Sequence, residues 1–419
     1  MLAFTFPGQG SQRPGMGRSW NDHPSWEVVD EASDISGRDL SRLLLEADQA
    51  ELTRTANAQL TTYVASLVAL DAIERMGIAP TICAGHSLGE YSALTASGAL
   101  AFEDGIRLVV ERGDAMHDAA ESRRGTMAAV LGADDDAVDA ACQRAEGEVW
   151  VANYNAPGQV VIAGEPDALS RAGDIVKTAG ARKVIALPVA GAFHTPLMAP
   201  ARARLRKALS DTPFAALDVP VVANVDGRVH AEAGDWPGLL SAQLCSPVRW
   251  RQTLSALDEL GATAVVEVGT GGVLTGLARR VLPDARSLSI ATPDDLQALV
   301  DAISGSETWH TFAAAHQGEH LYTSERVVVS PDNGVFTPEP SVDAPAPGGG
   351  GPQPGGAAAA VDTDTGAAAG SDVAVGDLLG LVGNAEVRTP FAGRIVGFLV
   401  HPGERVTAGQ PVAWLRVRA

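Results

Sequence analysis

The pattern of apolar and polar positions predicts an α/β fold for about the first 300 residues. Short, nearly continuous apolar runs indicate buried strands at 3–6, 82–84, 219–223 and 264–268. Between them, segments in which apolar residues recur with a helical period lie at 25–46, 57–76, 90–99, 102–117 and 196–210. Strands that alternate with helices in this way are typical of a sheet covered by helices.

A second pattern interrupts the first. Strand-like runs at 127–131, 149–152, 160–163 and 183–189 alternate with helical segments at 134–145 and 166–179. The order βαββαβ is the ferredoxin-like arrangement. We therefore expect a ferredoxin-like subdomain at 126–190, inserted into an α/β-hydrolase-like core formed by 1–125 and 191–305.

The last part of the chain carries an internal repeat. Residues 330–336 match 389–395, and residues 370–379 match 403–412, with glycines at corresponding positions. A tract rich in Pro, Gly and Ala at 338–370 predicts a flexible segment that interrupts the first half of the repeat. We expect a connector at 306–325 and a small all-β domain of two similar halves at 326–419.

Composition and charge limit the classes of function. The chain has 419 residues, 46% of them apolar, and a net charge of −20, which argues against nucleic acid as the main partner. Cys83, Cys142 and Cys245 show no spacing typical of a metal site or a disulfide, and they fit a reducing cytoplasm. We see no signal peptide and no apolar run near about 18 residues, so we expect a cytoplasmic protein outside the membrane.

Residues 85–89, Gly-His-Ser-Leu-Gly, form the pattern of a nucleophile elbow. The glycines permit a sharp turn from strand to helix, and Ser87 would be exposed at the start of that helix. The free N–H of Leu88 could then help to hold an oxyanion. Roughly half of such matches are ordinary turns. The strand before this segment and the alanine-rich helix after it favour the elbow.

Other residues could complete a catalytic site. His194 lies in a loop between a strand and a helix and is a candidate base for Ser87, whereas we interpret His86 as structural or site-lining. Arg112 lies on an apolar helix, where it could form a salt bridge or grip a substrate carboxylate. Gln9 lies in a glycine-rich turn. It could serve only to form that turn, or it could supply a second N–H for the oxyanion.

Seven segments together resemble the malonyl-CoA:acyl carrier protein transacylases and the acyltransferase domains of fatty acid and polyketide synthases. They lie at 6–12, 85–91, 112–113, 153–159, 191–194, 243–250 and 267–269. The resemblance implies that Ser87 is acylated and that His194 is its base. It further implies an oxyanion hole of Gln9 and Leu88, an Arg112 that binds the malonyl carboxylate, and a Gln243 that orients His194 through its backbone carbonyl. Two more residues would contact substrate: Asn153, and Phe193, which favours malonyl over methylmalonyl.

The resemblance also implies the reaction and its partners. A malonyl group would pass from malonyl-CoA to Ser87 and then to the thiol of an acyl carrier protein, with no cofactor. An acidic carrier needs a local basic patch, for which the best candidates are Arg202, Arg204, Arg206 and Lys207. That cluster could equally be a solvated helix face. A serine hydrolase and a non-catalytic interaction protein are alternatives, and Arg112 argues against the first.

The C-terminal repeat resembles biotinyl and lipoyl hammerhead domains. Those carriers need a lysine at the central hairpin, but residues 381–387 contain none, and no lysine follows Lys207. The domain therefore cannot carry a prosthetic group on a lysine. We expect it to dock or pack against another surface.

Overall fold

The computed structural model describes residues 1–189, 191–304, 318–320, 325–338, 371–400 and 403–417. Most of the expected flexible segment at 338–370 and of the expected connector at 306–325 lies outside these residues. The chain divides into two compact units, which we call the first unit (residues 1–72 and 80–303) and the second unit (residues 73–79 and 304–419).

A six-stranded sheet forms the centre of the first unit, in the order β10-β9-β1-β2-β7-β8. The strands are β1 (Leu2–Phe6), β2 (Ile82–Gly85), β7 (Val221–Val222), β8 (Val229–His230), β9 (Ala264–Val268) and β10 (Arg286–Ile290). All neighbours pair in parallel except β8, which runs antiparallel to β7. Because Phe6 pairs with Gly85, the turns after β1 and β2 begin side by side at the carboxyl end of these two central strands.

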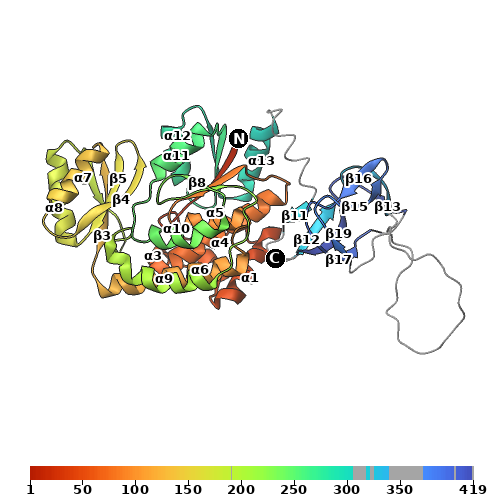
Figure 1. Ribbon diagram of the computed structural model, residues 1–419, viewed down its shortest axis with the longest axis horizontal. Coiled ribbons are helices and arrows are strands. Elements are labelled where there is room, and N and C mark those ends of the chain that lie inside the picture. The colour runs from red at the N-terminus through yellow and green to blue at the C-terminus, as the bar shows by residue number, and fades with distance from the viewer. Residues whose placement is uncertain (190, 305–317, 321–324, 339–370, 401–402, 418–419) are drawn as a thin grey trace, which may run out of the picture. The chain divides into compact units, whose positions relative to one another are not determined.

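Helices cover both faces of this sheet. They are α1 (Glu27–Ser36), α2 (Leu40–Leu45), α3 (Gln49–Thr53), α4 (Thr55–Glu74), α5 (Gly89–Ala96), α6 (Phe102–Ser122), α9 (Ala199–Asp211), α10 (Trp236–Gln243), α11 (Trp250–Glu259), α12 (Val273–Val281) and α13 (Leu296–Ser304). Apolar side chains of α11 and α12 pack with those of β1, β2, β7 and β9 in one core cluster. Figure 1 shows these two helices on one side of the sheet and α4, α6 and α9 on the other.

The helical pattern at 25–46 corresponds to two helices in the structure. Helix α1 ends at Ser36, and Gly37 follows in the left-handed conformation with φ 64°. Asp39 then caps α2 by accepting a hydrogen bond from the Arg42 N–H. Glycine after a helix and aspartate before the next are the usual stop and start residues, and the apolar spacing alone obscured them.

Between α6 and α9 the chain forms what we call the α7–α8 subdomain. Its elements are β3 (Thr126–Leu131), α7 (Asp135–Arg144), β4 (Val149–Ala156), β5 (Gln159–Gly164), α8 (Pro166–Thr178) and β6 (Lys183–Ala186). This is the element order expected from the sequence. The strands form an antiparallel sheet, β4-β5-β3-β6, and the two helices share a core with it. The Val248 N–H donates to the Ala152 carbonyl, so β4 is joined to the segment that follows α10.

The second unit consists of two antiparallel sheets, ordered β11-β12-β19-β17-β14 and β16-β15-β13-β18. The strands are β11 (Gly318–His320), β12 (Glu325–Val329), β13 (Gly334–Pro338), β14 (Asp372–Val373), β15 (Leu378–Val382), β16 (Ala385–Arg388), β17 (Gly393–Phe398), β18 (Arg405–Val406) and β19 (Pro411–Val417). Their inward side chains form one apolar core.

The sequence repeat corresponds to a repeated pattern of hydrogen bonds. In one half the Gly409 N–H donates to the Ser330 carbonyl over 2.8 Å, and in the other the Gly376 N–H donates to the Thr389 carbonyl over 2.7 Å. The hydroxyls of Ser330 and Thr389 each donate to the carbonyl two residues further on, both over 2.7 Å. The two halves of the second unit therefore share the same turn.

Candidate active site

A sharp turn connects β2 to α5 and presents Ser87. The backbone of Ser87 has φ 53°, a conformation that residues other than glycine rarely adopt. A Cβ at Gly85 would overlap the backbone of Gly89, and a Cβ at Gly89 would overlap the Phe6 carbonyl. Only glycine fits at either position, which is the physical reason for the two flanking glycines in the sequence.

His194 contacts Ser87 directly. The distance between Ser87 Oγ and His194 Nε2 is 2.7 Å. His194 Nδ1 donates to the backbone carbonyl of Gln243 over 2.9 Å, so Nε2 is free to accept from the serine hydroxyl. Burial, together with the nearby charge of Arg112, lowers the pKa of His194 to about 3. The imidazole is therefore neutral near pH 7, as a general base must be.

Arg112, on α6, brings a buried cation to the same point. Its Nη2 donates to Ser87 Oγ over 3.1 Å and to Gln243 Oε1 over 2.9 Å, and its Nη1 donates to Gln59 Oε1 over 2.6 Å. Within the described residues no carboxylate forms an ion pair with this guanidinium, so a salt bridge is not what holds it. Burial lowers the pKa of Arg112. A desolvated cation that makes no direct ion pair favours the binding of an anion.

Two side-chain amides hold the backbone of Ser87. Asn224, just after β7, accepts a hydrogen bond from the Ser87 N–H over 2.7 Å and donates to the Gly85 carbonyl over 2.6 Å. Gln243, at the end of α10, donates from Nε2 to the Ser87 carbonyl over 2.8 Å. The two peptide groups of the strained residue are thus bound from both sides.

Glu90, in the first turn of α5, is fully buried beside these amides. One carboxylate oxygen accepts from the Asn224 N–H and the other from Gln243 Nε2, each over 2.6 Å. Burial raises the pKa of Glu90 to about 7. Neither Glu90 nor Asn224 was predicted from the sequence to be a functional residue. Their positions, three residues after Ser87 and at the end of the strand beside β2, were the available signals.

The turn that carries Gln9 lies against the elbow. A Cβ at Gly8 would overlap the His86 carbonyl, so the two backbones are in close contact. Gln9 is half-buried, and its Oε1 is 3.5 Å from Gln59 Nε2. Leu88 is fully buried and directly precedes α5. Gln9 and Leu88, the two residues predicted to form the oxyanion hole, therefore lie at the carboxyl end of the strands that carry the elbow.

His86 is held away from Ser87. Its Nε2 bonds to Asn155 Oδ1 over 2.9 Å, and its ring meets Trp250 edge-on at 5.5 Å between centroids. Burial lowers its pKa. These contacts agree with a structural or site-lining residue.

The two remaining predicted substrate residues, Phe193 and Asn153, differ in how they relate to the cluster around Ser87. Phe193 is buried next to His194, and its ring fills the space beside Gly191. Asn153 is also buried, but it pairs through its backbone with Val248. Within the described residues no hydrogen bond joins the Asn153 side chain to the cluster around Ser87.

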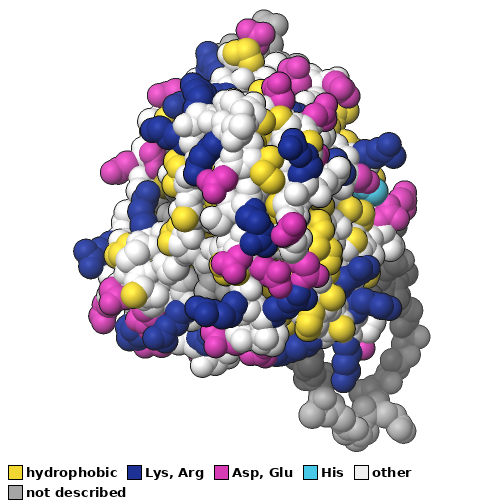
Figure 2. All heavy atoms as spheres, turned by 90° about the vertical axis from the view of Figure 1, so that its left-hand side faces the viewer, with side chains coloured by type: hydrophobic (Ala, Val, Ile, Leu, Met, Phe, Trp, Pro, Cys, Tyr) yellow, Lys and Arg dark blue, Asp and Glu magenta, His cyan; other side chains and the backbone are white. Residues whose placement is uncertain are grey.

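The four cations predicted to dock a carrier lie on α9: Arg202, Arg204, Arg206 and Lys207. Arg204 forms ion pairs with Glu111 and Asp118 of α6, so its charge is largely balanced. Arg202 donates from Nε to Ser241 Oγ over 3.3 Å. All four residues are exposed. Figure 2, which faces the α7–α8 subdomain, shows cations and anions intermixed over that face.

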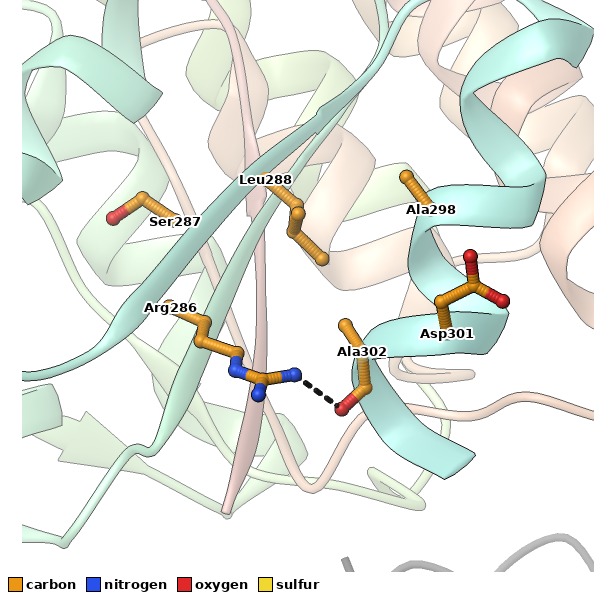
Figure 3. A pocket seen from close by; sticks show the side chains of 6 residues that line it. All are labelled: Arg286, Ser287, Leu288, Ala298, Asp301 and Ala302. Carbon is orange, nitrogen blue, oxygen red and sulfur yellow. Dashed lines mark hydrogen bonds between the residues drawn. The ribbon is translucent and has the colours of Figure 1, made fainter. Parts of the chain in front are cut away.

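A separate hollow lies between β10 and α13. It is lined by Arg286, Ser287, Leu288, Ala298, Asp301 and Ala302 (Figure 3). Arg286 Nη1 donates to the Ala302 carbonyl over 3.0 Å across it. None of the lining residues belongs to the cluster around Ser87.

Neither a metal site nor a membrane span occurs in the described part of the chain. No group of three or more His, Cys, Asp and Glu side chains there is placed to bind a metal ion. No helix there is long and apolar enough to cross a membrane.

Comparison with known proteins identifies the family. The model of the acyl transferase domain matches residues 3–296, more than half of the chain. The chain belongs to the acyl transferase family. This acyl transferase is 38% identical over 307 residues to a malonyl CoA-acyl carrier protein transacylase of Bacillus subtilis strain 168, covering 72% of this chain and 97% of that protein. It is 40% identical over 308 residues to the protein of the same name from Escherichia coli K12, covering 72% and 99%.

A solved structure agrees with the sequence relatives. It is a malonyl-transacylase in complex with its type II polyketide-synthase acyl-carrier protein, with a TM-score of 0.70 and 37% identity over 72% of this chain and 99% of that chain. The family membership expected from the sequence motifs is confirmed. The matched region ends at residue 296, so the strands of the second unit lie outside it.

Proposed function

We propose that this acyl transferase moves a malonyl group from malonyl-CoA to the phosphopantetheine thiol of an acyl carrier protein, in fatty acid or polyketide synthesis. The relatives carry the name of this activity at 38% and 40% identity. The observation that carries the proposal is Arg112 Nη2, 3.1 Å from Ser87 Oγ. A cation so close to a nucleophilic oxygen fits an acyl group that ends in a carboxylate.

In the first half-reaction, Ser87 attacks the malonyl thioester while its proton passes to His194 Nε2. The negative charge that develops on the carbonyl oxygen is stabilised by the N–H groups of Gln9 and Leu88. The intermediate collapses, and CoA leaves as a thiol with the proton from His194. Malonyl-Ser87 remains as an ester.

In the second half-reaction, the carrier thiol takes the place of CoA. His194 accepts its proton, and the thiolate attacks the malonyl-Ser87 ester. The serine oxygen then recovers the proton from His194. Both acyl transfers use one site in turn, so the kinetics are ping-pong. The reaction as proposed requires no metal or redox cofactor.

Substrate selection follows from two side chains. Arg112 pairs with the free malonyl carboxylate, which a plain serine hydrolase would not need to bind. Phe193 fills the space that an α-methyl group would occupy. One methyl group in an apolar pocket changes selectivity by about 10- to 200-fold, so methylmalonyl is disfavoured rather than excluded. We keep Asn153 as a lining residue with no direct bond to the acyl group.

The carrier is proposed to dock on α9. Arg206 and Lys207 are exposed there and provide charge for an acidic partner. Arg202 and Arg204 are already hydrogen-bonded or ion-paired, so they would contribute less. We place the reaction in the cytoplasm, because the three cysteines show no spacing typical of a disulfide.

Three fold assignments accompany the function. We propose that residues 1–125 and 191–305 form an α/β-hydrolase-like core and that 126–190 is a ferredoxin-like insertion. The order β4-β5-β3-β6 supports the second assignment. We assign the second unit, from 326 to 419, to the hammerhead-like class on the strength of its repeated turns. Its β15–β16 hairpin has no lysine, so it would dock or pack rather than carry a group.

Intact-protein mass spectrometry tests the activity. After incubation with malonyl-CoA, we expect the wild-type chain to gain one malonyl group. On addition of a phosphopantetheinylated carrier, that mass should move to the carrier. Loss of the label to water at the same rate without the carrier would indicate a hydrolase instead.

A further inference from the structure

The nucleophile is held in a costly conformation by groups outside its own turn. A non-glycine residue in the left-handed region is strained and persists only where its surroundings fix it. For Ser87, those surroundings are Asn224 at its N–H and Gln243 at its carbonyl. Both residues come from outside the elbow, Asn224 from the segment after β7 and Gln243 from the end of α10.

Glu90 binds both of these residues, Asn224 through its backbone N–H and Gln243 through its side-chain amide. Glu90 accepts the backbone N–H of Asn224 with one oxygen and the side-chain Nε2 of Gln243 with the other, each over 2.6 Å. The backbone carbonyl of Gln243 in turn accepts from His194 Nδ1. Glu90 is therefore the one described side chain that is bonded to the residues on both sides of Ser87 and, through Gln243, to the base.

We propose that Glu90 is a positioning residue: its ionised carboxylate fixes Asn224 and Gln243, and through them the backbone of Ser87 and the ring of His194. The inference rests on the proposed role of Ser87 as the nucleophile. It adds the group that keeps the nucleophile and its base correctly placed relative to each other.

The chemistry requires a carboxylate and not merely a polar side chain. Two donors point at Glu90, and only an ionised carboxylate accepts at both oxygens. A glutamine there would set its NH₂ against either the Asn224 N–H or Gln243 Nε2. If Gln243 rotated its amide in response, its NH₂ would face Arg112 and its oxygen would face the Ser87 carbonyl. Each arrangement leaves a donor or an acceptor unmatched in a buried site.

Charged groups around Glu90 act in opposite directions. Arg112 on α6 favours the carboxylate, and Asp226, in the turn after β7, disfavours it. His194 faces the same network but is neutral, because its pKa is about 3. Since burial raises the pKa of Glu90 to about 7, Glu90 is the member of this network that changes charge between pH 6 and 8. The protonated acid is a donor and, like glutamine, cannot serve both amides.

The test measures the reactivity of Ser87 without malonyl-CoA, so that it does not depend on the acyl specificity. Wild type and Glu90→Gln are reacted with a fluorophosphonate probe, and the rate of labelling at Ser87 is followed by mass spectrometry. We expect Glu90→Gln to label about 100-fold more slowly, the loss typical of a misplaced catalytic group.

Glu267→Gln is the matched control. Glu267 is fully buried on β9 and accepts from the Thr275 N–H over 2.7 Å and from the Gly272 N–H over 3.1 Å, with no bond to the cluster around Ser87. This variant should melt at a lower temperature yet label within about twofold of wild type. If both variants lose labelling equally, Glu90 is only a stability residue and the inference is overturned.

The pH profile separates positioning from stability, and its wild-type arm is informative even if the variant does not fold. Wild-type labelling should rise about tenfold from pH 6 to pH 8 as Glu90 ionises, and the profile of Glu90→Gln should be flat. A flat wild-type profile, or equal rates for wild type and Glu90→Gln, would overturn the inference. Absence of any labelling at Ser87 in wild type would instead overturn the proposed nucleophile.

Discussion

Arg112 donates a hydrogen bond from Nη2 to Oγ of Ser87 over 3.1 Å. The guanidinium is fully buried, and the described residues offer it amide and hydroxyl oxygens rather than a carboxylate. An acyl group attached to Oγ would lie beside this cation. A carboxylate one methylene beyond the acyl carbon would supply the missing counter-charge, which is the shape of malonate.

Arg112→Ala should therefore affect malonyl-CoA far more than acetyl-CoA. Loss of one partner of a buried charge pair costs about 2–5 kcal/mol, which is at least a 30-fold loss in kcat/KM for malonyl-CoA. Acetyl-CoA has no carboxylate and should change by less than about fivefold. Arg107→Ala is the control, because Arg107 is on the same helix but is exposed and paired with Glu103 and Asp104. An equal loss for both substrates would show that Arg112 is structural.

Ser87→Ala should abolish covalent loading while the fold is retained. The change removes one oxygen, and the backbone bonds to Asn224 and Gln243 remain available. Mass spectrometry after incubation with malonyl-CoA should find no added malonyl on the variant, with an unchanged circular dichroism spectrum. A labelled variant would mean that another residue is acylated.

His194 should make stability depend on pH. Its folded-state pKa of about 3 lies below the ordinary value of 6.5, because burial disfavours the imidazolium. Above pH 6.5 neither state binds the proton, so the full stability is present. Below it only the unfolded chain is protonated, and stability is lost progressively toward pH 3.

The size of this effect can be isolated with His194→Gln. From pH 7.5 to pH 5, urea denaturation followed by tryptophan fluorescence should show wild type losing about 1–2 kcal/mol more than the variant. Glu90 titrates in both proteins and cancels in the difference. Equal losses would place the ordinary pKa on His194.

The second unit should be dispensable for the chemistry. The family match ends at residue 296. The alignments with two relatives cover 97% and 99% of those proteins but only 72% of this chain, so almost nothing of either relative is left to match the second unit. A chain ending at residue 304 should load itself and a free carrier at a rate within about threefold of the full chain. A truncated chain that folds but fails to load the carrier would make the second unit part of the acceptor site. The full chain should bind no streptavidin, since no lysine follows Lys207.

The features that could be predicted from the sequence are those encoded by residues close together in the chain. The elbow around Ser87 was predictable because two glycines, a strand and a helix lie within a few residues. The order of elements in the α7–α8 subdomain was predictable for the same reason. Gly37 was overlooked because the apolar period continues across it, although its φ of 64° ends α1.

Glu90 and Asn224 show what local patterns cannot reveal. They are 134 residues apart and meet only because β7 pairs in parallel with β2. A buried glutamate early in an apolar helix has no periodicity of its own. Likewise, the position of Arg112 on α6 could be predicted from the sequence. That no described carboxylate pairs with it could be recognised only from the packing of α4, α6 and α10.

Ser87 and His194 are the only non-glycine residues in the described ranges with positive φ, at 53° and 61°. Glycine accepts such a backbone without strain, so Ser87→Gly would relieve about 1 kcal/mol while removing the nucleophile, whereas His194→Gly would also leave a cavity in place of the buried imidazole. A directed-evolution campaign that ranks variants by melting temperature alone would thus reward mutations that silence the enzyme. Any engineering of this chain for heat tolerance must score turnover in the same round.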